Sequence, residues 1–349
     1  MRELEQQVLN TYTTVSPSHT SADTQDEWNA LIKRRDAVVQ RRLHLLPQLF
    51  EGRTLLDLGC GTGEYTAYYA HLGANVTGVD FNPVSLKRME AFFDHHELKH
   101  KLVEVIETSV SEWSPEFEAY DICVSDGVLH HLSNPQEGFH KLCSTLRPGG
   151  IIYICVGTTD GAIQRDTMRQ IILKYADGLD EAVALSMELF SEYIERAVTY
   201  GHRTAEQVVN DNFLVEQNVR HSIEELMAWF REENITLQTT WPVLQPNVAE
   251  PVTADVIDWT TPDNAKQLAK HARPWAYSTL SISEILQTGD MESYFIKTEE
   301  KWDEEIIMIQ TLIAKDDLDG LRAYLPNCEV FGRGYSGLGD AQFVGVKKR

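Results

Sequence analysis

The stretch LLDLGCGTGEYT at residues 55–66 decides the fold of this chain, together with VTGVD at residues 76–80. An apolar run leads into a glycine-rich loop, and 17 residues after Gly63 the acidic Asp80 closes a second apolar run. Glycine tolerates positive φ and has no Cβ, so its backbone can approach a ligand closely. An acidic residue at this spacing can accept hydrogen bonds from both ribose hydroxyls. The pattern therefore predicts a strand–loop–helix–strand unit that holds a nucleoside.

Two further motifs follow downstream. The loop Gly59-Cys60-Gly61-Thr62-Gly63 reads GxGxG, whereas the dinucleotide fingerprint is GxGxxG. YDICVSDGVLHHLSNP at residues 120–135 resembles the fourth-strand motif of class I S-adenosylmethionine-dependent methyltransferases. LRPGG at residues 146–150, followed by IIYICV, resembles the lead into the fifth strand of that family. Because three motifs occur in the right order and spacing, the chain resembles this family. Binding of NAD is a poor alternative interpretation of the glycine loop.

The resemblance implies a site for S-adenosyl-L-methionine, with S-adenosyl-L-homocysteine as the product. The residues that it assigns to the cofactor are Tyr12, Asp57, Gly59, Gly61, Gly63, Asp80, Phe81, Ser109, Val110 and Ser125. The loop glycines would lie against the methionine part, and Asp57 would help to hold its amino group. Asp80 would bind the ribose diol, and Phe81 would pack on one adenine face. Backbone at Ser125 and Asp126 would border the sulfonium.

Two of these assignments leave alternatives open. The family often has an Asp and a small apolar residue after the third strand, which read adenine N6 and N1. This chain has Ser109-Val110 there, and the Ser could still accept from N6. Tyr12 follows a short helix candidate, and an N-terminal aromatic of the related family often folds over the cofactor. The alternative is a Tyr that packs on the surface of the core.

Two adjacent histidines after the fourth strand are the candidate bases. Methyl transfer is an in-line displacement, so alignment of the reacting atoms matters most. A base is needed only when the nucleophile must lose a proton, and histidine has a suitable pKa range. Adjacent residues on a turn point differently, so we favour His131 over His130, with a structural histidine as the alternative. Asp126 is a second candidate, for binding an amine or a hydroxyl.

Charge and hydropathy disfavour two classes of partner. The 349 residues carry a net charge of −22, from 53 acidic and 31 basic side chains. Nucleic-acid binders usually present a basic face. The densest basic stretch, Lys33-Arg34-Arg35, is interpreted as the solvated face of a helix. The N-terminal MRELEQQ has no apolar leader, and no segment approaches a membrane span in length. We therefore expect neither a nucleic acid nor a membrane as partner.

Cysteine and histidine spacing gives no metal or disulfide pattern. The cysteines are Cys60, Cys123, Cys143, Cys155 and Cys328. Their number is odd and none forms a CxxC pair, so we interpret them as reduced core thiols of a cytoplasmic protein. His96 and His100 have i, i+4 spacing beside His95 and Glu97, but no third convergent ligand accompanies them. They are interpreted as a solvated face, and no metal is expected.

Strands alternate with helices from residue 54 to residue 156, which predicts an α/β fold. We expect a doubly wound, Rossmann-like seven-stranded sheet, mostly parallel, with a helical lid inserted after the fifth strand and a C-terminal extension. The expected parts are an N-terminal helical cap at 1–50, a cofactor-binding core at 51–160, a helical substrate lid at 161–232, and the remaining core strands with the extension at 233–349. Polar lid residues that could line a pocket are Tyr200, His202, Arg203, Asp211, Asn212 and His221.

The last strand of the sheet has two candidates. ITLQTTW at 235–241 alternates and is expected to be the sixth strand. ESYFIKT at 292–298 and DAQFVGVKK at 340–348 both fit a seventh, antiparallel strand, and we slightly favour the first. Residues 242–290, rich in Pro, Thr and Asp, are interpreted as a long loop or a partner surface.

Together these features predict a methyltransferase that modifies an O or N atom of a small-molecule acceptor. A methyltransferase of a protein or carrier-bound substrate is the alternative enzyme, favoured by the acidic surface and by the unassigned residues 242–349. A protein that binds S-adenosylmethionine without methyl transfer is the alternative of another class, because fold does not fix function. The oligomeric state stays open, a homodimer included.

Overall fold

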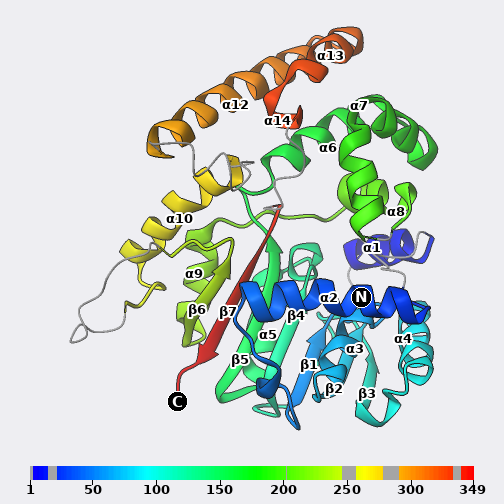
Figure 1. Cartoon of the computed structure of the whole chain (residues 1–349), viewed down its shortest axis with the longest axis vertical. Coiled ribbons are helices and arrows are strands. Elements are labelled where there is room, and N and C mark those ends of the chain that lie inside the picture. The colour runs from blue at the N-terminus through cyan, green and yellow to red at the C-terminus, as the bar shows by residue number, and fades with distance from the viewer. Residues whose placement is uncertain (1–2, 15–21, 202, 246–256, 278–290, 333–338) are drawn as a thin grey trace. The chain divides into compact units, whose positions relative to one another are not determined.

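The computed structural model describes residues 3–14, 22–201, 203–245, 257–277, 291–332 and 339–349. The chain folds as two compact units. The first consists of Met1–Gly157, Glu216–Ala269 and Ala341–Arg349, and the second of Thr158–Val215 and Lys270–Asp340. The second unit is therefore inserted into the first at two places in the sequence. The strands of the first unit lie side by side in one sheet (Figure 1).

The sheet has seven strands within the described residues, in the order β3-β2-β1-β4-β5-β7-β6. They are β1 Thr54–Leu58, β2 Asn75–Asp80, β3 Leu102–Glu107, β4 Tyr120–Asp126, β5 Leu146–Gly157, β6 Ile235–Trp241 and β7 Asp340–Lys347. Strands from β3 to β5 pair in parallel, and β6 pairs antiparallel with β7. The predicted mostly parallel, seven-stranded sheet is thus confirmed. The strand order reverses between β1 and β4, and ligands of such sheets bind at the carboxyl ends of the strands at this point.

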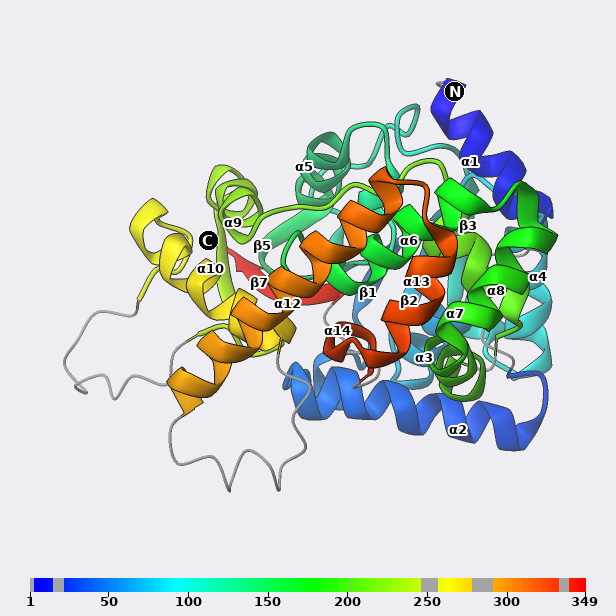
Figure 2. The ribbon, with the colours of Figure 1, turned by 90° about the horizontal axis from the view of Figure 1, so that it is seen from above.

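Helices cover both faces of the sheet. Figure 2 shows α2 and α5 on opposite sides of it. The longer helices of this unit are α1 Glu3–Thr14, α2 Gln25–Asp36, α3 Glu64–His71, α4 Pro83–His95, α5 Pro135–Thr145 and α9 Ile223–Glu232. Its shorter helical turns are η1 Ala37–Arg42, η2 Pro47–Leu49, η3 Lys99–Lys101 and η4 Leu129–His131. Asn82 and Asn134 cap α4 and α5 with their side chains, and a proline follows each cap. This pairing starts a helix soon after a strand ends.

The second unit is helical and has its own apolar core. Its helices are α6 Ile163–Tyr175, α7 Gly178–Gly201, α8 Ala205–Val209, η5 Asn210–Leu214, α12 Met291–Ala314, α13 Leu318–Tyr324, η6 Leu325–Asn327 and α14 Glu329–Gly332. The core includes Met168, Ile171, Phe190, Ile194, Trp302, Ile309 and Leu321. Phe190 and Ile194 of α7 are buried in this core, although the backbone at Phe190 leaves helical geometry.

The favoured seventh strand was wrong. Residues 292–298 lie in α12, and the seventh strand is β7 at Asp340–Lys347. The apolar residues Trp302, Ile306 and Ile309 fall at i, i+4 and i+7, and this helical period extends back through the shorter alternating segment. The interpretation of 242–290 as a loop was also wrong in part, because α10 occupies Pro262–Tyr277. Residues 246–256 and 278–290 lie outside the described residues.

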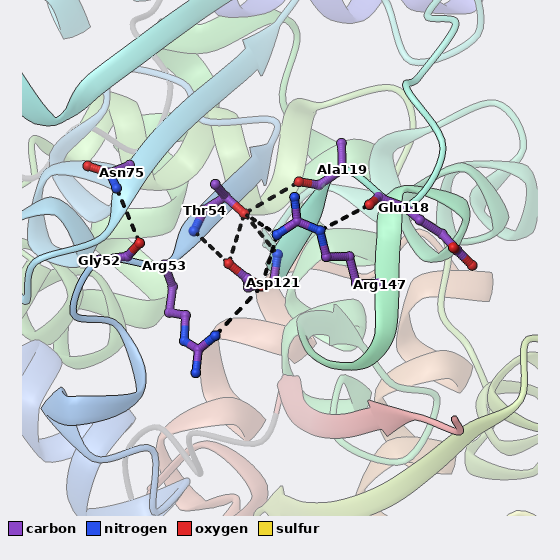
Figure 3. Close-up of polar contacts among 8 residues, drawn as sticks. All are labelled: Gly52, Arg53, Thr54, Asn75, Glu118, Ala119, Asp121 and Arg147. Carbon is purple, nitrogen blue, oxygen red and sulfur yellow. Dashed lines mark hydrogen bonds and ion pairs between the residues drawn. The ribbon is translucent and has the colours of Figure 1, made fainter.

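The amino ends of β1 and β4 are joined by the carboxylate of Asp121 (Figure 3). Its Oδ2 accepts from the backbone N and the Oγ1 of Thr54, both at 3.0 Å. Its Oδ1 accepts from Nη1 of Arg147 at 3.0 Å. Burial would raise the pKa of Asp121, but the Thr54 and Arg147 donors outweigh it and lower that pKa. These bonds join the two strands at the edge opposite their carboxyl ends.

Candidate active site

The glycine loop lies between β1 and α3, and two of its glycines are required by packing. Gly59, Gly61 and Gly63 have positive φ values of 81°, 53° and 84°. A Cβ on Gly59 would lie 2.3 Å from Val128, and one on Gly63 would lie 2.3 Å from Met89. A Cβ on Gly61 would meet no atom within 4 Å. The loop therefore packs on the segment after β4 at one glycine and presents bare backbone at another.

Asp80, at the end of β2, is bound to this loop. Its Oδ2 accepts the N–H of Gly61 at 2.9 Å, and its Oδ1 accepts the N–H of Asn82 at 2.9 Å. Burial raises the pKa of Asp80, and these backbone donors offset part of the increase. The carboxylate is thus held beside Gly61, and its binding of a ribose stays a prediction. Phe81 follows it and is half-buried, and its contact with adenine stays a prediction.

Asp57 is a buried carboxyl in β1. Its Oδ2 accepts from Oγ1 of Thr66 at 2.6 Å. Burial raises the pKa of Asp57 to about 7, and the Thr66 hydrogen bond and the charge of Arg35 offset only part of the effect. The group therefore titrates close to neutral pH in the folded protein.

This raised pKa predicts a stability effect for Asp57→Asn. An unfolded Asp titrates near about 3.9, so ionisation destabilises the folded state progressively between about pH 4 and about pH 7. The variant should therefore melt a few degrees above the wild type at pH 8, with a smaller gain at pH 5. Thermal unfolding of both proteins at the two pH values measures this. An equal gain at both values would contradict the assignment.

A buried ion pair lies at the end of β4, and no sequence motif indicated it. Arg35 is 5% exposed, so its interpretation as part of a solvated face was wrong. Its Nη1 lies 2.9 Å from Oδ2 of Asp126, and its Nη2 donates to the Tyr69 hydroxyl at 2.8 Å. The Tyr153 hydroxyl donates to the same Asp126 oxygen at 2.9 Å. Burial raises the pKa of both phenols, which remain neutral partners of the pair. Asp126 thus holds Arg35 of α2 against the sheet.

Ser125 and Ser109 are both buried, and their hydroxyls bond to protein groups. Ser125 Oγ donates to the carbonyl of Leu58 at 3.0 Å, which joins the carboxyl ends of β4 and β1. Ser109 Oγ lies 2.9 Å from Ser111 Oγ and accepts the N–H of Glu112 at 3.3 Å. Val110 lies beside Ser111 in the wall of a small pocket. The cofactor contacts of these residues stay predictions.

The two histidines have different environments. His130 is buried, and its Nδ1 accepts the N–H of Gly157 at 3.3 Å. His131 is half-buried, and its Nδ1 lies 2.6 Å from the carbonyl oxygen of Gln217. A carbonyl only accepts, so Nδ1 of His131 carries a proton, and in the neutral imidazole Nε2 carries the lone pair. This geometry favours His131 over His130 as a base.

A short segment that follows the second unit in sequence holds both histidines. The N–H of Val219 donates to the carbonyl of His130 at 2.9 Å. The side chain of Gln217 donates to the carbonyl of Leu132 at 3.0 Å, beside its backbone contact with His131. The N–H of His221 donates to the carbonyl of Gly157 at 3.0 Å. Residues 216–221 therefore fix the orientation of the turn that carries the candidate base.

Tyr12 of α1 lies against His131. Its hydroxyl is 3.4 Å from Nε2 of His131, and the two rings meet edge to face at 6.0 Å. Thr11 donates to the carboxylate of Glu216 at 3.0 Å, which ties the same end of α1 to the segment 216–221. The structure thus brings Tyr12 to His131, the candidate base, and its place over the cofactor stays a prediction.

The polar residues expected to line a lid pocket bond mainly to one another or to the core. Arg203 pairs with Asp211 at 3.0 Å, and Asn212 accepts from the buried Arg165. His221, which belongs to the first unit, lies edge-on to Trp229. His202 and the side chain of Tyr200 lie outside the described residues. The lid residues therefore supply no observed site, and the parts 161–232 and 233–349 stay predictions.

Metal-binding clusters and membrane-spanning helices are both absent from the described residues. No group of three or more His, Cys, Asp or Glu side chains in this part of the chain could hold a metal ion. No helix among these residues has the length and apolar character needed to cross a membrane.

Comparison with known proteins identifies a methyltransferase domain in this chain. Residues 56–154 match the family model described as "Methyltransferase domain". A ubiquinone biosynthesis O-methyltransferase of Methylobacterium sp. is 31% identical over 121 residues, which cover 34% of this chain and 47% of that protein. An uncharacterized protein of Synechococcus sp. is 29% identical over 212 residues, covering 54% of this chain and 48% of that one. The chain thus spans about half the length of these curated relatives.

Among solved structures, PKMT2 from Rickettsia typhi aligns with 92% of this chain and 53% of its own, at 12% identity and a TM-score of 0.48. The family match covers β1 to β5, which carry the glycine loop, Asp80 and the turn with the histidines. The region from β1 to β5 thus carries a methyltransferase domain, as the sequence motifs predict.

Proposed function

We propose that this protein transfers a methyl group from S-adenosylmethionine to an O or N atom of a small-molecule acceptor, with a hydroxyl oxygen as the preferred nucleophile. The observation that carries the proposal is the fixed tautomer of His131. Its Nδ1 proton is held by the Gln217 carbonyl at 2.6 Å, which leaves Nε2 as the basic nitrogen. A base in this form suits a nucleophile that must lose a proton.

The residues at the carboxyl ends of β1 and β2 fit the cofactor. Gly61 has space where a Cβ would lie, and its N–H is bonded to Asp80. Asp80 would accept the ribose hydroxyls, and Asp57 would support the methionine end. The pKa of Asp57 near 7 also suits such a partner, because a nearby ammonium group would favour the ionised carboxylate. When bound, the cofactor supplies an electrophilic methyl carbon on a sulfonium.

The turn after β4 would then place the base beside the methyl group. Val128 packs on Gly59, so η4 begins next to the glycine loop. His131 would take the proton of the acceptor hydroxyl through Nε2, in the position where the Tyr12 hydroxyl now lies at 3.4 Å. The Gln217 carbonyl would stabilise the imidazolium that forms, because it keeps its hydrogen bond to Nδ1. Alignment of the nucleophile with the methyl carbon would supply most of the rate acceleration beyond that of the base.

The relatives support an oxygen acceptor. The Methylobacterium protein and a Schizosaccharomyces pombe protein, 27% identical over 173 residues, are both named ubiquinone biosynthesis O-methyltransferases. Because the chain spans only part of each, the acceptor itself is best found by screening. Phenols and catechols are the first classes to test, since their hydroxyls need only a weak base.

The test is release of S-adenosylhomocysteine from S-adenosylmethionine with a panel of phenols, catechols, carboxylic acids and amines. The proposal expects turnover with at least one hydroxyl compound, at a rate above that of every amine in the panel, because the base assists only nucleophiles that lose a proton. Calorimetric titration with S-adenosylhomocysteine, with NAD as a control, runs in parallel. Binding without release of product across the whole panel would favour a protein that does not transfer methyl.

A further inference from the structure

An arginine lies at the carboxyl end of β5, next to the turn that carries the candidate base. Arg220 is half-buried, and its guanidinium lies against Gly157, the last residue of β5. A Cβ at residue 157 would lie 2.5 Å from Nη1 and 3.5 Å from Cζ of Arg220. The missing side chain of Gly157 therefore lets the guanidinium approach the backbone at the edge of the sheet where ligands of such folds bind.

Gly157 connects this guanidinium to the two histidines. Its N–H donates to Nδ1 of His130 at 3.3 Å, and the ring centroids of His130 and His131 lie 4.3 Å apart. Arg220, Gly157 and His130 thus form a short series of contacts that ends at His131. A cation and the candidate base are therefore close enough for a single small acceptor to reach both.

Hydrogen bonds hold Arg220 in place. The N–H of the next residue, His221, donates to the carbonyl of Gly157 at 3.0 Å. Nη1 of Arg220 donates to Oδ1 of Asn218. A side chain held in this way loses less conformational entropy when a ligand binds to it. A guanidinium has five N–H donors, and the bond to Asn218 uses one of them.

The charge of Arg220 indicates which group of an acceptor it would bind. A single guanidinium balances a single negative charge, and its planar fork can give two parallel hydrogen bonds to a carboxylate. The whole chain carries a net charge of −22, which disfavours the approach of an anion in general. An acceptor with a carboxylate would therefore depend on a local cation beside the base.

We propose that Arg220 binds a carboxylate of the acceptor, so that hydroxylated aromatic acids are preferred to neutral phenols. The hydroxyl of such a molecule would reach Nε2 of His131 while its carboxylate pairs with the guanidinium. Arg220 is a substrate-binding residue in this scheme and takes no part in the proton transfer. This role of Arg220 rests on the proposed function, because it names the acceptor class of the same site.

Hydroxybenzoic acids and their methyl esters are matched pairs of acceptors for the test. The ester is neutral at the same position, and its phenol is no less acidic than that of the acid. The wild type should methylate the hydroxyl of at least one acid with a kcat/KM roughly tenfold or more above that of its ester. Release of S-adenosylhomocysteine measures the rates, and NMR of the product identifies the methylated atom.

Substitution of Arg220 should remove this preference. Arg220→Gln should bring the ratio of acid to ester close to one, mainly by raising the KM of the acid. Arg220→Lys should give an intermediate ratio, because it keeps the charge and loses the fork. Calorimetry of the acid with protein saturated by S-adenosylhomocysteine should give the same order of affinities.

Arg53→Gln is the matched control, since Arg53 has a side chain 60% exposed and lies 3.9 Å from Asp121 at the opposite edge of the sheet. It should leave the ratio at the wild-type value. Equal kcat/KM for acid and ester in the wild type, or methylation of the carboxylate, would overturn the proposal. Equal slowing of both acceptors in Arg220→Gln would also overturn it, because Arg220 would then only support the turn.

A second variant and a separate outcome complete the test. Asn218→Ala releases the guanidinium but keeps its charge, so it should lower the ratio by a smaller factor, should Arg220→Gln fold poorly. A ratio that stays at the wild-type value in this variant would count against the proposal. Failure to release S-adenosylhomocysteine with any acceptor would instead refute the proposed function.

Discussion

Asp80→Ala is expected to weaken binding of S-adenosylhomocysteine by roughly a hundredfold or more. The carboxylate would accept both ribose hydroxyls, and each hydrogen bond to a charged group contributes about 1.5–3 kcal/mol. The substitution also removes the acceptor of the Gly61 N–H, which orients the loop at 2.9 Å. Isothermal titration calorimetry of both proteins measures the change in dissociation constant.

The control for this experiment is Asp121→Ala. Asp121 is a carboxylate of the same sheet, bonded to Thr54 and Arg147 at the opposite edge (Figure 3). Its loss should lower the melting temperature with little effect on affinity. An affinity in Asp80→Ala that matches the wild type would refute the ribose assignment, whereas equal weakening in both variants would indicate general loss of structure.

The second large effect is expected for His131→Ala, which should lower turnover roughly 10²–10⁴-fold with the acceptor found by screening. Affinity for S-adenosylhomocysteine should stay within about twofold, because the imidazole would act on the acceptor rather than on the cofactor. Product release under saturating cofactor, with calorimetry of the same variant, measures both quantities. Free imidazole added to the variant should restore part of the rate.

His140→Ala is the matched control, since His140 is an exposed histidine of α5 that pairs with Glu233 on the surface. It should turn over at the wild-type rate. If His131→Ala did the same, His131 would be a structural histidine, and the acceptor would need no base from this turn.

Much of the first unit could be predicted from sequence because its signals are local. The glycine loop and the apolar strands each depend on neighbouring residues, and the expected alternation of strands with helices from residue 54 to residue 156 is observed. The seventh strand could not be chosen reliably, because a seven-residue alternating segment carries little information once a longer helical period overlaps it.

The features that sequence reasoning could not predict are contacts between distant residues. Arg35 looked like part of a solvated basic stretch, and only the fold reveals that Asp126, 91 residues later, neutralises it. Glu5 reaches Ser111 across 106 residues. The partner of His131 is a backbone carbonyl, a group that every residue carries, so no side-chain pattern could have identified Gln217.

The hydrogen bond between the N–H of His221 and the carbonyl of Gly157 joins the two segments of the first unit from which Thr158–Val215 departs and to which it returns. This bond uses backbone atoms alone. The entropy of closing a loop grows only slowly with its length, so the length of Thr158–Val215 has little effect on the cost of closing this junction. The turn with His130 and His131 is therefore anchored within the first unit, whatever the length of chain between Gly157 and Glu216.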